Sequence, residues 1–182
     1  MPRALSGRLK NWDYSRPGHY FITICTYKHN RFLAKITNGQ VILSPVGQIA
    51  FEEISKTIHL HSEILSLGWV IMPNHVHWLI SIPVETPRGA SLQGNPGSQI
   101  ITHTYKNHPN FFNKLNQKSK QTIPLIINQF KSSVTRRCRQ NNLLFAWQSG
   151  YYDEIIHSPK RLFIVQKYIK NNPKNWAKDN LY

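Results

Sequence analysis

The sequence predicts an α+β fold in which helices cover one face of an antiparallel, ferredoxin-like (RRM-like) sheet. Two apolar runs, residues 65–72 and 75–82, are separated only by Pro73-Asn74, a pair typical of a tight turn between antiparallel strands. Strand-like and amphipathic helical segments follow the order β, α, β, β, α, β, α, which such a sheet accommodates. With 182 residues, of which 40% are hydrophobic, the chain is long enough for a single domain with its own core.

The N-terminal half of the domain begins with a strand and a hairpin. Residues 19–27 are rich in aromatic and β-branched side chains, which favour a strand. Asn38-Gly39 is a turn signal before the short apolar run 40–43, so we expect a hairpin there. Residues 46–61 have the apolar spacing of a helix. The charged side chains of this helix are expected to face solvent: Glu52, Glu53 and Lys56.

The C-terminal half contains a loop, a basic helix and the last strand. Residues 83–122 hold several prolines, glycines and basic side chains, and we expect them to form a flexible loop. The spacing of apolar and basic residues predicts an amphipathic helix over 124–141. Residues 147–156 then provide a last strand.

The net charge of +15 comes from 23 Lys and Arg residues against 8 Asp and Glu residues. This excess indicates a polyanionic partner. The sequence shows no membrane span or signal peptide, so we expect nucleic acid and a cytoplasmic, nucleoid-associated protein. A basic N-terminal arm (1–16) and a basic C-terminal tail (173–182) are expected to flank the domain. The candidate phosphate contacts are Arg3, Arg8, Lys10, Arg16, Lys131, Arg136, Arg137, Arg139 and Lys174.

The triplet His75-Val76-His77 opens the second apolar run. Side chains alternate between faces along a strand, so both imidazoles point to the same side of the sheet. Such a pair can supply two ligands of a metal site, although histidine pairs also occur as surface or hydrogen-bonded core groups. The similar triplet 59–61 lies within a predicted helix, where residues two apart diverge, so those histidines cannot converge on one ion.

A closing helix follows Ser158-Pro159, an N-cap residue with proline at the first helical position, and is expected to end near Pro173. Tyr168 and Asn172 are four residues apart and therefore share one face of this helix. Placed against the histidine pair, the Asn172 oxygen could be a third ligand for Mg²⁺ or Mn²⁺, and Tyr168 a nucleophile. On the helix pattern alone, Tyr168 also fits an ordinary packing aromatic.

Five segments of the chain carry motifs of a known family. They are HYFITICTYK (19–28), GWVIMPNHVHWLI (68–80), INQFKSSVTRR (127–137), WQSGYYDEII (147–156) and YIKNNPKNW (168–176). In this order they resemble the single-tyrosine HUH transposases, and among them the REP-associated tyrosine transposases. The resemblance covers nearly the whole chain outside the 83–122 loop.

The resemblance implies an HUH-endonuclease type of fold and a metal-dependent endonuclease and strand transferase acting on single-stranded DNA. The metal ligands of the family carry over to His75, His77 and Asn172, and the nucleophile to Tyr168. Such an enzyme recognises hairpin (REP-like) DNA and holds the cut strand as a 5′-phosphotyrosine, so that no nucleotide cofactor is needed. Both a monomer and a homodimer remain open.

Some residues depart from this family pattern or offer alternatives to the proposed nucleophile and function. Many relatives have histidine after the YYD aspartate, where this chain has Glu154. Tyr151 and Tyr152 are rival nucleophiles, although their setting favours packing or base stacking. A different class of function is a non-catalytic protein that binds single-stranded nucleic acid on an RRM-like sheet.

Overall fold

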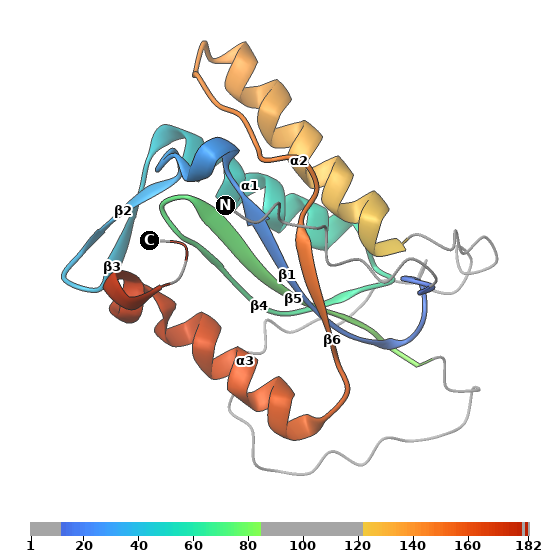
Figure 1. Cartoon of the computed structure of the whole chain (residues 1–182). Coiled ribbons are helices and arrows are strands. Elements are labelled where there is room, and N and C mark those ends of the chain that lie inside the picture. Colours follow the sequence, from blue (N-terminus) through green and yellow to red (C-terminus); the bar gives the residue numbers. More distant parts are fainter. Residues whose placement is uncertain (1–11, 85–121, 180, 182) are drawn as a thin grey trace.

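The computed structural model describes residues 12–84, 122–179 and 181. Its centre is a four-stranded antiparallel sheet with the order β4-β5-β1-β6 (Figure 1). The strands are β1 (Gly18–Cys25), β4 (Leu65–Ile71), β5 (His75–Ile82) and β6 (Tyr152–Ile156). When only these four strands are numbered along the chain, their order in the sheet, read from β6 to β4, is 4-1-3-2. A helix lies in the connection from β1 to β4 and another in the connection from β5 to β6. The predicted α+β class and antiparallel ferredoxin-like sheet are confirmed.

The register of the sheet determines which side chains share a face. Thr23 of β1 pairs with His77 of β5 on one side and with Tyr152 of β6 on the other. Directly paired residues point to the same face, so these three side chains form a row across the sheet. Their sequence neighbours, such as Ile22 and Trp78, point to the opposite face.

Helices α1 (Pro45–Leu60) and α2 (Thr122–Gln140) cover this opposite face. Trp78 is fully buried and packs against Phe130 of α2, with ring centroids 6.0 Å apart. Helix α1 begins with Ser44, whose hydroxyl accepts a hydrogen bond from the Gly47 amide at 3.0 Å. A Cβ on Gly47 would lie only 1.9 Å from the carbonyl oxygen of Leu33, so this close approach requires glycine.

Helix α3 (Pro159–Asn171) lies on the other face of the sheet, which corrects the expectation of helices on one face (Figure 1). Val165 and Ile169 of α3 pack on Leu79 and Ile156 in a second, smaller core. The reason is that every residue of β5 is buried, so apolar side chains on both faces of this strand need cover.

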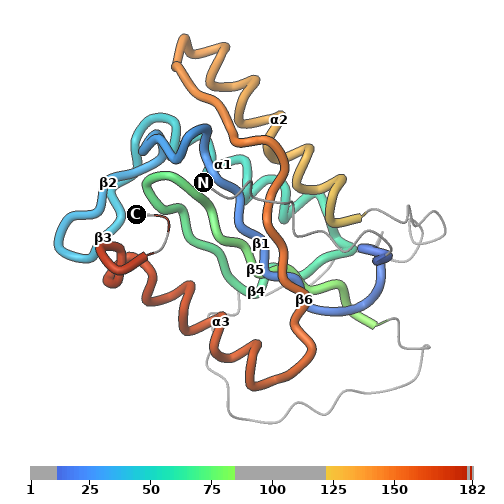
Figure 2. Tube along the Cα trace, viewed as in Figure 1, coloured from blue at the N-terminus to red at the C-terminus, as the bar shows by residue number. Residues whose placement is uncertain are grey.

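Helix α3 ends at Asn171, just before Pro173, as expected. The chain then continues as a 3₁₀ helix, η2 (Asn172–Lys178), in which the proline occupies one of the first two positions, where no backbone donor is needed. The predicted hairpin is present as β2 (Ala34–Thr37) and β3 (Gln40–Leu43) and lies beside η2, where Gly39 approaches Lys174 (Figure 2).

Helix α2 is joined to α1 by an ion-pair cluster. Arg137 of α2 donates to Glu53 at 3.0 Å and to Glu52 at 2.6 Å. Glu53 is only 4% exposed, which corrects its expected position in solvent, because the guanidinium stabilises the buried carboxylate. Of the flexible loop expected over 83–122, residues 85–121 lie outside the described residues, as do residues 1–11 of the basic arm.

Candidate active site

His75 and His77 lie at the start of β5 on the α3 face, with ring centroids 4.4 Å apart. Both are buried, and a polar partner orients each ring. Nδ1 of His75 lies 2.8 Å from Oδ1 of Asn74, and Nδ1 of His77 lies 2.9 Å from Oγ1 of Thr23. Nε2 of each ring is thereby left for the site. A hydrogen bond at the other ring nitrogen is typical of metal-binding histidines.

Burial keeps both imidazoles neutral at physiological pH. Loss of solvent lowers the pKa of His75 to about 4, with Asp179 acting in the opposite direction. Burial, together with the neighbouring His75, lowers the pKa of His77 to about 3. A neutral imidazole retains the lone pair that a metal ion requires.

Helix α3 brings Tyr168 to the histidines, and Asn172 follows directly after the helix. Both side chains contact Asp179, which agrees with the shared face that the helical spacing predicted. The Tyr168 hydroxyl oxygen lies 3.1 Å from Nε2 of His77, and its ring meets Phe21 edge-on with centroids 6.1 Å apart. The Tyr168 side chain is 42% exposed, so a substrate can reach it. Asn172 is buried and donates through Nδ2 to Asp179 at 2.9 Å.

Asp179 is a site residue that the sequence reasoning missed. Its Oδ2 accepts hydrogen bonds from Tyr168 at 3.1 Å and from Asn172, while its Oδ1 accepts from the Leu181 amide at 2.8 Å. Although burial opposes it, these hydrogen bonds hold the pKa of Asp179 below its usual value. One signal was available: Asp179 is the only acidic residue of the strongly basic stretch 155–182.

The donor atoms fit a divalent cation. Ligand atoms of His75, His77 and Asp179 lie within 4.8 Å of one another. Nε2 of His75 and Oδ1 of Asn172 are buried and have no hydrogen-bond partner among the described residues. Buried polar atoms without partners are costly, and a bound ion would satisfy both. This mixture of nitrogen and oxygen donors suits Mg²⁺ or Mn²⁺ and also binds Zn²⁺.

The electrostatics around Tyr168 oppose its ionisation. Burial, the Asp179 charge and the hydrogen bond to Asp179 raise the pKa of Tyr168 to about 12. The phenol is therefore protonated at neutral pH. A cation held by the neighbouring donors would offset the Asp179 charge and favour the phenolate.

The rival tyrosines lie in different surroundings. Tyr151 is 4% exposed and belongs to the core under α1 and α2. Tyr152 faces the same side as Thr23, one strand further from His77, and its hydroxyl accepts a hydrogen bond from Gln148. Glu154 forms a two-point ion pair with Arg161, both contacts being 2.6 Å.

The basic candidates on α2 fall into two groups. Lys131 donates to the carbonyl oxygens of Gln148 and Gly150, at 2.8 and 2.6 Å, and Arg137 is held by Glu52 and Glu53. Arg136 and Arg139 are exposed and line a groove. The remaining candidates are scattered: Arg16 lies over the Trp12 ring, Lys174 is exposed on η2, and Arg3, Arg8 and Lys10 lie outside the described residues.

The histidines of the other triplet do not converge. His61 ends α1 and lies 2.6 Å from both Glu63 and Gln129, whereas His59 is exposed on the helix. Cys25 is a buried core residue, as expected. Among the described residues, no helix combines the length and apolar character needed to cross a membrane.

One sequence relative shows the family to which the chain belongs. The chain is 33% identical over 177 residues to an uncharacterized protein of Haemophilus influenzae, covering 96% of this chain and 91% of that protein, and it belongs to the same family. No family model matches the chain.

A solved structure shares the fold of this chain. A REP-associated tyrosine transposase bound to a REP hairpin superimposes with a TM-score of 0.53 at 16% identity, covering 88% of this chain and 69% of that one. At this identity the likeness shows a shared fold and nothing more. A putative transposase from Deinococcus radiodurans gives a TM-score of 0.43 at 14% identity, covering 90% of this chain and 97% of that one.

Proposed function

We propose that this protein is a metal-dependent endonuclease and strand transferase, a transposase that cuts single-stranded DNA through a 5′-phosphotyrosine on Tyr168. The observation that carries the proposal is the contact between the Tyr168 hydroxyl and His77 Nε2, 3.1 Å, beside two buried donor atoms that have no hydrogen-bond partner in the described part of the chain. A hydroxyl nucleophile next to a set of ligands for a divalent ion is suited to metal-assisted phosphoryl transfer to a tyrosine.

His75, His77 and Asn172 would hold the ion, and Asp179 is a fourth donor within reach. When bound, the ion supplies Lewis-acid stabilisation of the phosphate charge and favours the ionised phenol. Thr23 and Asn74 keep the two imidazoles oriented through their Nδ1 atoms. Phe21 packs on both His77 and Tyr168 and fixes the nucleophile against the ligand set.

In the reaction, the Tyr168 oxygen forms a bond to phosphorus while the bond from phosphorus to the 3′ oxygen breaks. The phenol hydrogen leaves toward Asp179 Oδ2, which already accepts it at 3.1 Å, and the departing 3′ oxygen takes up a proton as a hydroxyl. Attack of a 3′ hydroxyl on the phosphotyrosine reverses the step and joins strands, so no nucleotide cofactor is consumed.

The substrate in this proposal is hairpin (REP-like) DNA in the nucleoid. Supporting it are the net charge of +15, the exposed cations Arg16, Arg136, Arg139 and Lys174, and the fold shared with a transposase that binds a REP hairpin. The basic arm and tail, parts of which lie outside the described residues, would add to this contact. The proposal is compatible with a monomer or a homodimer.

A denaturing gel tests the proposal. Labelled single-stranded DNA containing a hairpin is incubated with protein and Mn²⁺, and a covalent protein–DNA band is expected. Tyr168→Phe should abolish this band, whereas Tyr152→Phe, a matched change on the same face of the sheet, should retain it. Tight DNA binding without any covalent band would favour the alternative, a non-catalytic protein that binds single-stranded nucleic acid.

A further inference from the structure

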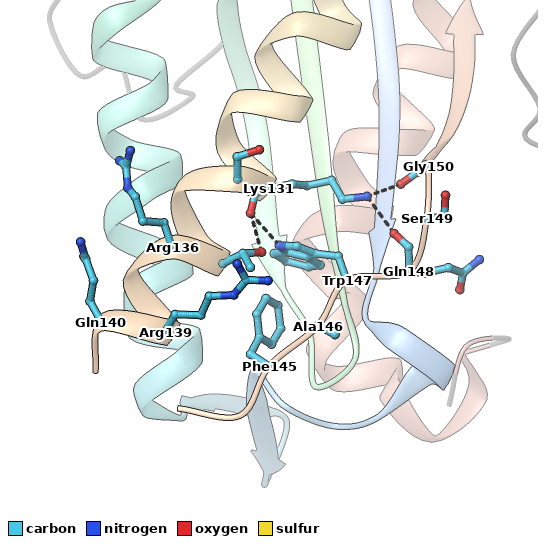
Figure 3. A pocket seen from close by; sticks show the side chains of 12 residues that line it. Lys131, Arg136, Arg139, Gln140, Phe145, Ala146, Trp147, Gln148, Ser149 and Gly150 are labelled. Carbon is cyan, nitrogen blue, oxygen red and sulfur yellow. Dashed lines mark hydrogen bonds between the residues drawn. The ribbon is translucent and has the colours of Figure 1, made fainter. Parts of the chain in front are cut away.

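A groove of about 700 Å³ lies between the C-terminal half of α2 and residues 145–150 (Figure 3). Two exposed cations, Arg136 and Arg139, come from the helix, and two half-buried aromatic rings, Phe145 and Trp147, come from the opposite wall. The groove lies against α2, whereas Tyr168 and the histidines lie on the α3 face. It is therefore a separate site from the candidate active site.

Among the described residues, no acidic side chain neutralises the charge of the groove. None of the residues that line it is acidic, and the structure shows no ion pair for Arg136 or Arg139 within its described part. Arg137, by contrast, turns to Glu52 and Glu53 on α1. Two guanidinium groups about one helical turn apart form a site for phosphates.

Ring contacts and hydrogen bonds hold the aromatic wall in place. The rings of Trp147 and Phe145 meet at 84° with centroids 4.7 Å apart, and Trp147 also packs on Phe130. Nε1 of Trp147 donates to the Lys131 carbonyl at 3.2 Å, and the Lys131 ammonium holds the carbonyls of Gln148 and Gly150 (Figure 3). A fixed aromatic surface beside cations is the pattern of sites that bind single-stranded nucleic acid.

The groove wall leads directly to the active site across the sheet. Trp147 forms an isolated antiparallel β-bridge with Thr26, and the backbone amide of Gln148 donates a hydrogen bond to the Cys25 carbonyl at 2.9 Å. Cys25 in turn pairs with His75. Two strand spacings therefore separate Gln148 from the histidines, about 10 Å, the length of about three stacked nucleotides. The Gln148 side chain reaches the active-site face itself, where it donates to Tyr152.

We propose that this groove binds an unpaired segment of the DNA substrate, adjacent to the phosphate that Tyr168 attacks. Arg136 and Arg139 contact phosphates, and a base stacks on Trp147 and Phe145. The strand then crosses the sheet edge at Gln148 toward the histidines. Stacking requires an unpaired base, so the occupant is a single strand and not the hairpin stem. The inference rests on the proposed function for its substrate.

The first test measures binding of an unstructured single-stranded oligonucleotide, by fluorescence anisotropy over a range of salt. All proteins carry Tyr168→Phe and no metal is added, so that failure of the cleavage chemistry does not affect the result. Arg136→Gln with Arg139→Gln should weaken binding tenfold or more. It should also reduce the slope of log K against log salt by about 1.4, the value for two phosphate contacts on a single strand.

The matched control is Lys160→Gln with Lys167→Gln, which removes the same charge from exposed positions two turns apart on α3. This pair should alter affinity by less than the groove pair and leave most of the slope. Equal losses from both pairs would overturn the proposal, because the groove would then contribute only to the overall charge.

The second test locates the base. Oligonucleotides with a single 5-iodouracil at successive positions are irradiated with the protein, and the crosslinked peptide is identified by mass spectrometry. One position should crosslink to the peptide containing Phe145 and Trp147. Crosslinks confined to other parts of the chain at every position would refute the assigned stacking site.

Discussion

The two faces of strand β5 differ in what their burial achieves. On the α1 and α2 face, Val76, Trp78 and Ile80 are fully buried among apolar side chains. On the α3 face, His75 and His77 are buried almost as completely, yet His75 Nε2 has no partner within the described residues. The first face stabilises the fold, whereas the second maintains polar atoms at an energetic cost. Unsatisfied buried groups of this kind indicate a function that compensates for them.

The largest contrast should come from removing the histidines. His75→Ala with His77→Ala is expected to reduce metal-dependent cleavage by at least about 10³-fold, because Lewis-acid stabilisation is worth several kcal/mol. Cleavage of hairpin DNA in Mn²⁺ measures this loss. Circular dichroism and salt-sensitive DNA binding should remain near normal. Loss of both the native circular dichroism signal and DNA binding would show that the α3 face, like the α1 and α2 face, has a structural role.

A change on the α1 and α2 face should mainly affect the free energy of unfolding. Trp78→Ala is expected to lower the free energy of unfolding by about 3–5 kcal/mol, since it leaves a large cavity against Phe130. Urea denaturation measures the loss, and His77→Gln, the next residue on the other face, serves as the control with a clearly smaller change. Similar losses from both variants would remove the distinction between the faces.

The contribution of the Thr23 hydroxyl to metal binding by His77 should be measurable separately. Thr23→Val removes the oxygen that lies 2.9 Å from Nδ1 of His77 and should weaken Mn²⁺ binding about 10–100-fold. Isothermal titration calorimetry gives the affinity. Thr23→Ser keeps the hydroxyl and should bind the ion nearly normally, so equal weakening in both variants would contradict this role.

The last expected effect is a pH dependence of the stability of the metal-free protein. The pKa values of His75 and His77, about 4 and about 3, lie below the usual 6.5. Between pH 6.5 and pH 4 the two histidines bind protons in the unfolded chain but not in the folded chain. Their contribution to the free energy of unfolding is therefore fully present above about pH 6.5 and is lost as the pH falls toward 4.

Urea midpoints measured at pH 7 and pH 5 test this dependence. The midpoint of the natural protein should fall more over this interval than that of a variant with His75→Gln and His77→Gln. The histidines outside the site are common to both proteins, so their contribution cancels. An identical decrease in both proteins would exclude the buried pair as the source.

Local patterns predicted most of the fold. Apolar runs, the Pro73-Asn74 turn and the Ser158 cap led to strands and helices close to those observed, and alternation along β5 predicted the shared face of the histidines. The second helix-covered face was not predicted, because a periodicity says which side of a helix is apolar and not which layer it joins.

The parts of the site that sequence reasoning missed depend on tertiary contacts. Asp179 follows a 3₁₀ segment whose path could not be read beyond Pro173. Arg137 and Lys131 resemble the exposed cations of α2 in sequence, and only the positions of Glu53 and of the Gln148 carbonyl show that they act within the protein. The local sequence shows which residues share a face of one helix or strand. It does not show which residue of another helix or strand will be their hydrogen-bond partner.

The contact between His77 and Tyr168 joins positions 91 residues apart. The hairpin of β4 and β5 needs only a short turn and can assemble early, but α3 can dock only after the chain has closed a much longer loop. We expect the ligand histidines to be in place before the nucleophile during folding. Under the proposed function, a newly synthesised or partly unfolded chain would therefore hold the two histidines of the site without the Tyr168 contact that cleavage needs.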